Sequence, residues 1–568
     1  MKFVYFLGFF YLFLGLFFCL CISVFSIPLV LIFDLGSLMC FDYFQFWLFF
    51  DFYSLVYLFV LTFIVGRVHF FIWDYMSEEL NLFRFLFVLN FFVFFMIILI
   101  ISPCFFSFIL GWDGLGFSSF VLVAWYGCDL SRSSSIKTFL TNRVGDGFLL
   151  VSLCMFVRQG HFGFLFFDSF CFMLLFFLIL VAFTKRAHFP FRNWLPDAMA
   201  APTPVSALVH SSTLVTAGLF LMFRFRYCYR YDLLRFIHNV GLWTLFIGSF
   251  GACVDYNSKK VVAYSTISQL GFISYIMSYG FYDLRFFYIM VHAIFKAMLF
   301  ISVGDLIGSS FHYQDIRHMG GVGLYRPFSS FNVFFSLFSL CGFPFLAGFY
   351  IKELVVGLVL FVNLNLFSVF CFFFSLLLTA FYSFRLFYFL CFGDFNKLNS
   401  LFSYKPSLLS VLVLYFAVFF LGYFLGLYGY LWLNMGSSLF IVFFIFISGI
   451  FGLYFFNYFY LYSRFVGLFK YFSKMFYLTY LNFKVSFVFS VGNFFSSLVD
   501  KGFYLFSFIG YMDNLFFLGW NQIISGFFFS KWLYLLGLSF FFILIVCVLL
   551  WDSFISWLFY FENKVWEK

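Results

Sequence analysis

The chain has 568 residues, of which 65% are hydrophobic and only 10% are charged, and its mean hydropathy is +1.07. Long apolar runs joined by short polar loops exclude a soluble protein and leave no room for a separate soluble domain. The net charge of +9 comes from dispersed lysines and arginines, which disfavours nucleic-acid binding and fits loops beside lipid headgroups.

Runs long enough to cross a bilayer recur along the whole chain, since one span needs about 20 apolar residues. We therefore predict an all-α, polytopic membrane protein with roughly 14 to 16 transmembrane helices. The run after Lys2 shows no cleavage signature and is interpreted as the first helix rather than a signal peptide. The expected spans are 3–33 (one long or two short), 44–66, 84–101, 103–126, 137–157, 164–184, 199–224, 236–254, 261–280, 284–308, 328–350, 354–379, 381–393, 406–427, 433–460 and 533–556.

The first charges inside apolar surroundings are carboxylates. Asp113 lies in GWDGLG, in the middle of the span 103–126, where a carboxylate is costly unless it is protonated or paired. The alternative is a helix break that leaves Asp113 in water. Arg143 and Asp146 are i, i+3 neighbours in TNRVGDGFLL, so Asp146 is either a second transport carboxylate or half of a structural salt bridge.

A polar, proline-rich stretch follows at 184–220. Lys185 comes directly after an apolar run and five residues before Pro190, which breaks a helix. Ionisable groups inside membrane helices usually line ion or proton paths, although a lysine at the end of a span can also extend to the interface. His210 lies in PVSALVHSSTLVTAG; it is either a proton relay or a packing residue.

A similar pattern recurs downstream. His292 and Lys296 share one helix face at i, i+4 within FYIMVHAIFKAMLF. Pro344 interrupts another apolar span and is followed by Lys352 and Glu353. Paired interrupted helices in two halves are typical of transporters built from inverted repeats, so we predict such repeats over roughly 103–224 and 236–350 or slightly beyond. Arg385 interrupts the next apolar run.

No cofactor or metal site is predicted in this chain. The 13 cysteines are scattered without a Cys-x-x-Cys pair, and histidines do not cluster at ligand spacing. A phosphate-cradling glycine loop is also missing from the sequence. If electrons or nucleotides matter to the activity, other chains must handle them.

Taken together, several segments resemble the proton-translocating, antiporter-like subunits of respiratory complex I. The similarity covers about residues 50–390, and its most specific part is WLPDAMAAPTPVSALVH. The other segments are GWDGLGFSSF, NRVGDGF, AYSTISQLGF, HAIFKAMLF and GFPFLAGFYIKE. The resemblance implies two inverted five-helix repeats with broken helices, and a place in the mitochondrial inner membrane. A coding genome rich in thymine, as in some organelles, would explain the 114 phenylalanines.

The same resemblance implies roles for individual residues. Asp113 would stand where the family carries a glutamate paired with the lysine of the first broken helix, here Lys185. Because aspartate is one methylene shorter, that pair is expected to be longer or bridged by water. His210 would relay the proton onward, and Asp146 would support the pair.

In the second half, His292 and Lys296 would form the central relay. Lys352, supported by Glu353, would be the exit on the second broken helix, and Arg385 stands at a position that the family keeps basic. Tyr288 replaces a histidine found in many members, so more of this relay is expected to pass through water.

The C-terminal third is basic and aromatic over 464–531, which favours a lateral amphipathic helix of the kind that the distal member of the family carries. Two ordinary spans near 475–498 and 503–529 are the alternative. The expected division is N-terminal helices 1–102, first repeat 103–224, second repeat 236–393, further spans 394–463, lateral helix 464–531 and final anchor helix 532–568.

Two functional classes remain open. In the first, the chain is a core membrane-arm subunit of a proton-pumping NADH:ubiquinone oxidoreductase. Its partners would be the other membrane-arm subunits, above all the adjacent antiporter-like one, together with membrane lipids, and NADH, FMN, iron–sulfur clusters and ubiquinone would be bound elsewhere in the complex. In the second, it belongs to a multi-chain cation/proton antiporter, which shares the lysines on broken helices.

Overall fold

The computed structural model describes residues 2–24, 28–34, 45–77, 79–158, 172–310, 312–343, 346–362 and 366–392. Contacts divide the chain into two compact units, Met1–Thr479 and Tyr480–Lys568, and all described residues belong to the first. The spans expected at 406–427, 433–460 and 533–556, the lateral helix 464–531 and the anchor 532–568 lie outside the described residues.

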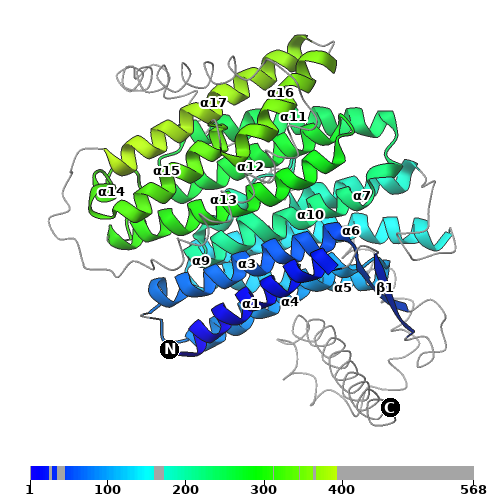
Figure 1. Ribbon diagram of the computed structural model, residues 1–568, viewed down its shortest axis with the longest axis horizontal. Helices are drawn as coiled ribbons and strands as arrows, with labels where there is room; N and C mark the ends of the chain where they lie inside the picture. The colour runs from blue at the N-terminus through cyan, green and yellow to red at the C-terminus, as the bar shows by residue number, and fades with distance from the viewer. Residues whose placement is uncertain are drawn as a thin grey trace, which may run out of the picture. The chain divides into compact units, whose positions relative to one another are not determined.

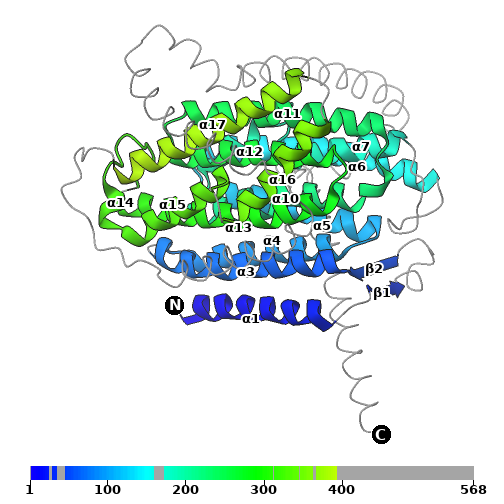
Figure 2. The same cartoon turned by 45° about the horizontal axis from the view of Figure 1, so that its top comes forward.

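The N-terminal part pairs two long helices and a hairpin. Helix α1 (Lys2–Val24) packs along α3 (Phe52–Tyr75), and both views show it at the edge of the helical bundle (Figures 1 and 2). Between them, β1 (Leu29–Asp34) pairs antiparallel with β2 (Gln45–Phe50). The prediction of helix throughout 3–33 and 44–66 was therefore wrong at these two segments, because short apolar runs carry no periodicity that separates strand from helix.

The next helices form a group around the first expected repeat. Its elements are α4 (Leu82–Ile101), α5 (Phe105–Val123), α6 (Asp129–Arg158), α7 (Phe172–Lys185), α8 (Trp194–Asp197), η1 (Ala198–Ala200), α9 (Thr203–Val205), η2 (Ser206–Thr213) and α10 (Leu214–Arg224). Helix α7 ends at Lys185, and Ala187 then adopts a left-handed φ of +52°, which no α-helix continues through. The prolines of this stretch lack backbone donors and keep it irregular.

The remaining elements are η3 (Arg226–Cys228), α11 (Tyr231–Val254), α12 (Ser258–Met277), α13 (Tyr282–Ser309), α14 (Val322–Tyr325), α15 (Pro327–Cys341), α16 (Ala347–Val362) and α17 (Leu366–Cys391). The expected span 328–350 is thus two helices, α15 and α16, divided after Cys341. Likewise, the boundary expected between the spans 354–379 and 381–393 falls inside α17, which is continuous from Leu366 to Cys391.

Small residues let the helices approach closely. Along α11 and α12, a Cβ at Gly248 would lie 2.6 Å from the Ser268 backbone nitrogen, and one at Gly271 would lie 2.4 Å from that of Leu245. Such contacts replace hydrophobic driving force as the source of helix association in a bilayer. Within the described ranges, nine helices are long and apolar enough to cross a membrane.

Candidate functional site

The first helix break places a lysine against a tryptophan. Lys185, the last residue of α7, has none of its surface exposed. Its Nζ donates a 2.7 Å hydrogen bond to the carbonyl oxygen of Trp112 on α5 and lies 3.8 Å from the centre of the Trp112 ring. The ammonium group is therefore held by a backbone dipole and an aromatic face.

The two carboxylates predicted beside Lys185 are both near it. Asp146 on α6 accepts a 3.1 Å hydrogen bond from Trp112 Nε1 and a 3.2 Å one from the partly exposed Arg143. Asp146 and Asp113 both attract Lys185 electrostatically, and the attraction from Asp146 is the larger. In the described part of the chain, neither carboxylate forms an ion pair with Lys185 within 4.0 Å.

His210 lies in a widened turn, the π-helical segment η2. Its ring is 1% exposed and packs edge-on against Trp194, with 6.0 Å between ring centres. Neither ring nitrogen has a hydrogen-bond partner among the described residues. Thr213 donates 2.7 Å to the carbonyl of Leu208, five residues earlier, which accompanies the wider turn. The histidine is thus buried and available to a water or to a moving neighbour.

The second half carries another buried lysine on a continuous helix. Lys296 on α13 is fully buried, and its Nζ donates 2.6 Å to the hydroxyl of Ser265 on α12. His292, one turn earlier, is 1% exposed, and its ring nitrogens have no partner within the described segments. One turn before it, Tyr288 shares a 2.5 Å hydrogen bond with Gln269 of α12. The α12–α13 interface is therefore lined by polar groups.

The third lysine lies beyond the second helix break. Lys352 on α16 is 3% exposed and donates to the carbonyl oxygen of Leu340, near the end of α15. Cys341, next in sequence, contacts the Ser383 hydroxyl at 2.7 Å. Lys352 and Lys296 repel each other electrostatically, so both positive groups share one low-dielectric region.

The two supporting residues differ in their surroundings. Glu353 follows Lys352 on α16 and is only half-buried. Arg385 on α17 is 4% exposed and donates hydrogen bonds to the carbonyl oxygens of Cys253 and Asp255 at the end of α11. Its position therefore joins α17 to α11, away from the three lysines' own hydrogen bonds.

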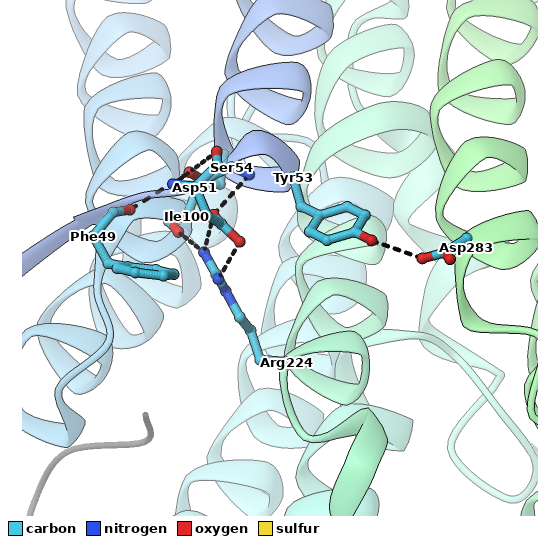
Figure 3. Close-up of polar contacts among 7 residues, drawn as sticks. All are labelled: Phe49, Asp51, Tyr53, Ser54, Ile100, Arg224 and Asp283. Carbon is cyan, nitrogen blue, oxygen red and sulfur yellow. Dashed lines mark hydrogen bonds and ion pairs between the residues drawn. The ribbon is translucent and has the colours of Figure 1, made fainter. Parts of the chain in front are cut away.

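Sequence reasoning missed a partly buried ion pair that joins the N-terminal helices to the first expected repeat (Figure 3). Arg224, at the end of α10, makes a bidentate pair with Asp51 at 2.9 and 3.1 Å, and it also reaches the Ile100 carbonyl at 3.4 Å. Asp51 at the same time caps α3 through the Ser54 amide. Tyr53 donates to Asp283 of α13 at 2.7 Å. The lone Asp51 in QFWLFFDFYSLVY was the available signal.

Among the described residues, no group of three histidines, cysteines or acids is placed to hold a metal ion. The described residues instead bury lysines, histidines and arginines, which are spread through one helical body. Buried lysines beside two helix breaks define a class of antiporter-like, multi-pass membrane proteins.

Comparisons with known proteins identify the family within that class. Residues 102–379 match the family described as NADH:quinone oxidoreductase/Mrp antiporter, TM. The chain is 44% identical over 366 residues to NADH-ubiquinone oxidoreductase chain 5 of Locusta migratoria, covering 63% of this chain and 64% of that protein. It is 40% identical to the Caenorhabditis elegans protein of the same name, covering 66% and 71%. The chain belongs to the NADH-ubiquinone oxidoreductase chain 5 family.

A solved structure shares the fold. The Mrp complex from Dietzia sp. DQ12-45-1b superposes with a TM-score of 0.73 at 21% identity, covering 86% of this chain and 57% of that one. The alignment spans slightly less than two thirds of the Locusta relative's length. Together with the nine apolar helices of the described residues, these matches establish a multi-pass membrane protein of antiporter-like fold.

Proposed function

We propose that the chain translocates protons as a core membrane-arm subunit of NADH:ubiquinone oxidoreductase, in the mitochondrial inner membrane. The observation that carries the proposal is the trio of buried lysines, Lys185, Lys296 and Lys352, whose hydrogen bonds go to neutral oxygens. A lysine without a bonded carboxylate can exist charged or neutral with little rearrangement, and a proton carrier needs both forms.

The proposed mechanism is a charge-coupled relay. Burial penalises the ammonium form of Lys185, whereas Asp146 and Asp113 favour it. A movement that changes the distance between Lys185 and these carboxylates therefore loads or releases a proton. His210, in its widened turn, would accept that proton, and Lys296 and Lys352 would pass it on, with His292 beside Lys296.

Redox chemistry belongs to other subunits under this proposal. NADH, FMN, iron–sulfur clusters and ubiquinone would be bound elsewhere in the complex, and the energy of quinone reduction would reach this chain as a conformational or electrostatic change. The neighbouring antiporter-like subunit and membrane lipids would be its immediate contacts. The exposed phenylalanines of α1, including Phe6, Phe13 and Phe17, provide an apolar face suited to lipid.

The assembly is tested by gentle solubilisation of the native membrane and separation of its complexes by size. We expect the chain to co-migrate with NADH:quinone reductase activity in a very large assembly. Migration in a smaller assembly that lacks this activity would contradict the proposal and favour a cation/proton antiporter, whose fold the chain shares. Sodium-dependent transport by that smaller assembly would then identify the antiporter directly.

The relay is tested separately with Lys185→Ala. We expect the variant to assemble normally and to lose proton translocation, because alanine removes the group that carries the proton while adding no bulk. Lys137→Ala is a suitable control, since Lys137 forms an exposed ion pair with Asp197. Undiminished translocation in Lys185→Ala would remove Lys185 from the mechanism, whatever the assembly experiment shows.

A further inference from the structure

Two buried arginines, Arg186 and Arg285, lie outside the proposed relay of lysines and histidines. Arg186 follows Lys185 directly, and Arg285 lies in the first turn of α13; neither exposes any surface. Arg186 contacts the Met222 sulfur and reaches the Leu270 carbonyl at 3.4 Å, and Arg285 donates 2.8 Å to the Leu219 carbonyl. Both guanidinium groups therefore border the same turns of α10.

These two groups lie close enough to repel each other electrostatically. The phenol of Tyr229, which precedes α11, interacts electrostatically with both arginines. The charge of Arg186 also acts on the buried His188. Arg186, Arg285 and Tyr229, which come from three separate segments, thus lie near one another. Arginine has five N–H donors and no acceptor, and it stays protonated in proteins, so the region is rich in donors and positive charge.

The donors of this cluster exceed the acceptors that the described residues provide. Arg186 Nε, Arg285 Nε and Nη1, and the Tyr229 hydroxyl are buried without a hydrogen-bond partner there. Three acids on adjoining elements are engaged or solvated. Asp51 is paired with Arg224, Asp283 accepts from Tyr53, and Asp232 is exposed. Buried charges without counter-charges are strongly destabilising, so a negative partner is required.

We propose that Arg186 and Arg285 bind a small monovalent inorganic anion of the chloride class. The donor set fits an anion because the unpartnered guanidinium and phenol groups all donate hydrogen bonds and the guanidinium groups are positively charged. The occupant must be small, since both guanidinium side chains are completely enclosed and a lipid headgroup would bring its chains with it. The bound anion also offsets the positive charge that Arg186 adds next to Lys185, so it sets the field in which that lysine works.

Bromide is the probe for this site, because it replaces chloride and scatters more strongly. The native membrane complex is imaged at high resolution in sodium chloride, sodium bromide and sodium gluconate at equal ionic strength. We expect a peak within hydrogen-bond reach of Arg186 and Arg285 that strengthens in bromide and disappears in gluconate. An empty site in bromide, or a carboxylate from residues 393–568 or from a partner chain in its place, would overturn the proposal.

A pair of variants separates this site from general halide effects. Arg285→Gln should lose the bromide peak and lose the gain in thermal stability that chloride gives over gluconate, since a ligand stabilises only a protein that binds it. Arg317→Gln is the matched control, because Arg317 pairs with Asp315 on an exposed loop, and it should keep both. An identical halide response in the two variants contradicts the assignment. Should Arg285→Gln fail to assemble, the salt-exchange images of the native complex still decide the question.

Discussion

Trp112 contacts both Asp146 and Lys185, which form no direct ion pair with each other. Its indole N–H holds Asp146 at 3.1 Å, while its carbonyl oxygen and ring face hold the Lys185 ammonium. A desolvated contact between a cation and an aromatic ring is worth about 2 kcal/mol, which is enough to keep Lys185 in place but not to lock it as a charged pair. The residue therefore keeps the lysine responsive to both carboxylates.

This arrangement predicts an order between the two carboxylates. Asp146→Asn should lower proton translocation more than Asp113→Asn, because Asp146 attracts Lys185 more strongly and is fixed by Trp112. We expect a loss of roughly tenfold for Asp146→Asn, the effect of about 1.4 kcal/mol on the transfer step. Translocation rates of reconstituted complexes, at matched assembly, measure it. A larger loss in Asp113→Asn would restore Asp113 as the principal partner.

The sequence alone drew attention to the three buried lysines of the site but not to their contacts. Asp113, Lys185, Lys296 and Lys352 were noticeable because each interrupts an apolar run. Trp112 was not, since tryptophan in a membrane helix is ordinary and its role depends on where α6 and α7 pack against α5. The contact geometry is a property of tertiary structure, which no local pattern specifies.

At the scale of elements, the second helix break depends on one glycine. Gly342 caps α15 with a φ of +83°, and a Cβ there would lie 3.0 Å from Cδ of Lys352. The left-handed backbone and the close lysine stem both require a residue without a side chain. The break and the position of Lys352 are therefore set by the same residue.

Gly342→Ala should disturb both the helix break and the position of Lys352. The left-handed conformation costs an alanine roughly 1–2 kcal/mol, and the added methyl pushes against Lys352, so we expect weaker assembly together with reduced translocation per assembled complex. Gly116→Ala is the control within α5, because a Cβ there meets nothing within 4 Å and alanine favours a helix by up to about 1 kcal/mol. Equal behaviour of the two variants would show that the break tolerates a side chain.

A second feature at the scale of elements is the ion pair between Asp51 and Arg224. This carboxylate caps α3 and binds Arg224 at the end of α10, so it ties the N-terminal helices to the first expected repeat (Figure 3). Side chains of the pair are only 16–17% exposed, and a charge left alone in such a place is poorly solvated. The pair therefore acts as a structural joint.

Arg224→Gln should loosen that joint by about 3 kcal/mol, near the lower end of the cost of breaking a buried pair. The measurement is the temperature at which the solubilised complex releases or loses this chain. Lys137→Gln removes an ion pair whose side chains are 52% and 29% exposed, and it should cost less than about 1 kcal/mol. Similar losses in both variants would mean that the Asp51 pair is not a joint.

Element prediction succeeded where the bilayer itself dictates the answer. A span of about 20 apolar residues has few alternatives to a helix in hydrocarbon, and α4, α5 and α13 follow directly. It was wrong where apolar character is uninformative. The six-residue segments of β1 and β2 are as hydrophobic as the helices beside them. The start of α17 at Leu366 was also missed, although Asn363 and Asn365 directly precede it.

At the scale of the whole molecule, the two breaks are connected through α12 and α13. Lys296 lies on α13 and bonds Ser265 of α12; α13 also packs against η2, which carries His210, and against α16, which carries Lys352. Both break regions thus contact one central helix. Under the proposed function, this connection would let a single proton path, rather than two independent ones, pass through the chain.

A single path predicts that the lysines at its two ends act as a unit. Lys185→Ala and Lys352→Ala should each abolish most translocation, and the double variant should be no worse than either alone, because groups in one mechanism are strongly non-additive. Translocation by the four reconstituted complexes, each normalised to NADH:quinone reductase activity, completes the cycle. Losses that multiply in the double variant, with partial activity in each single one, would instead show two separate channels, and the central relay at Lys296 would then serve only one of them.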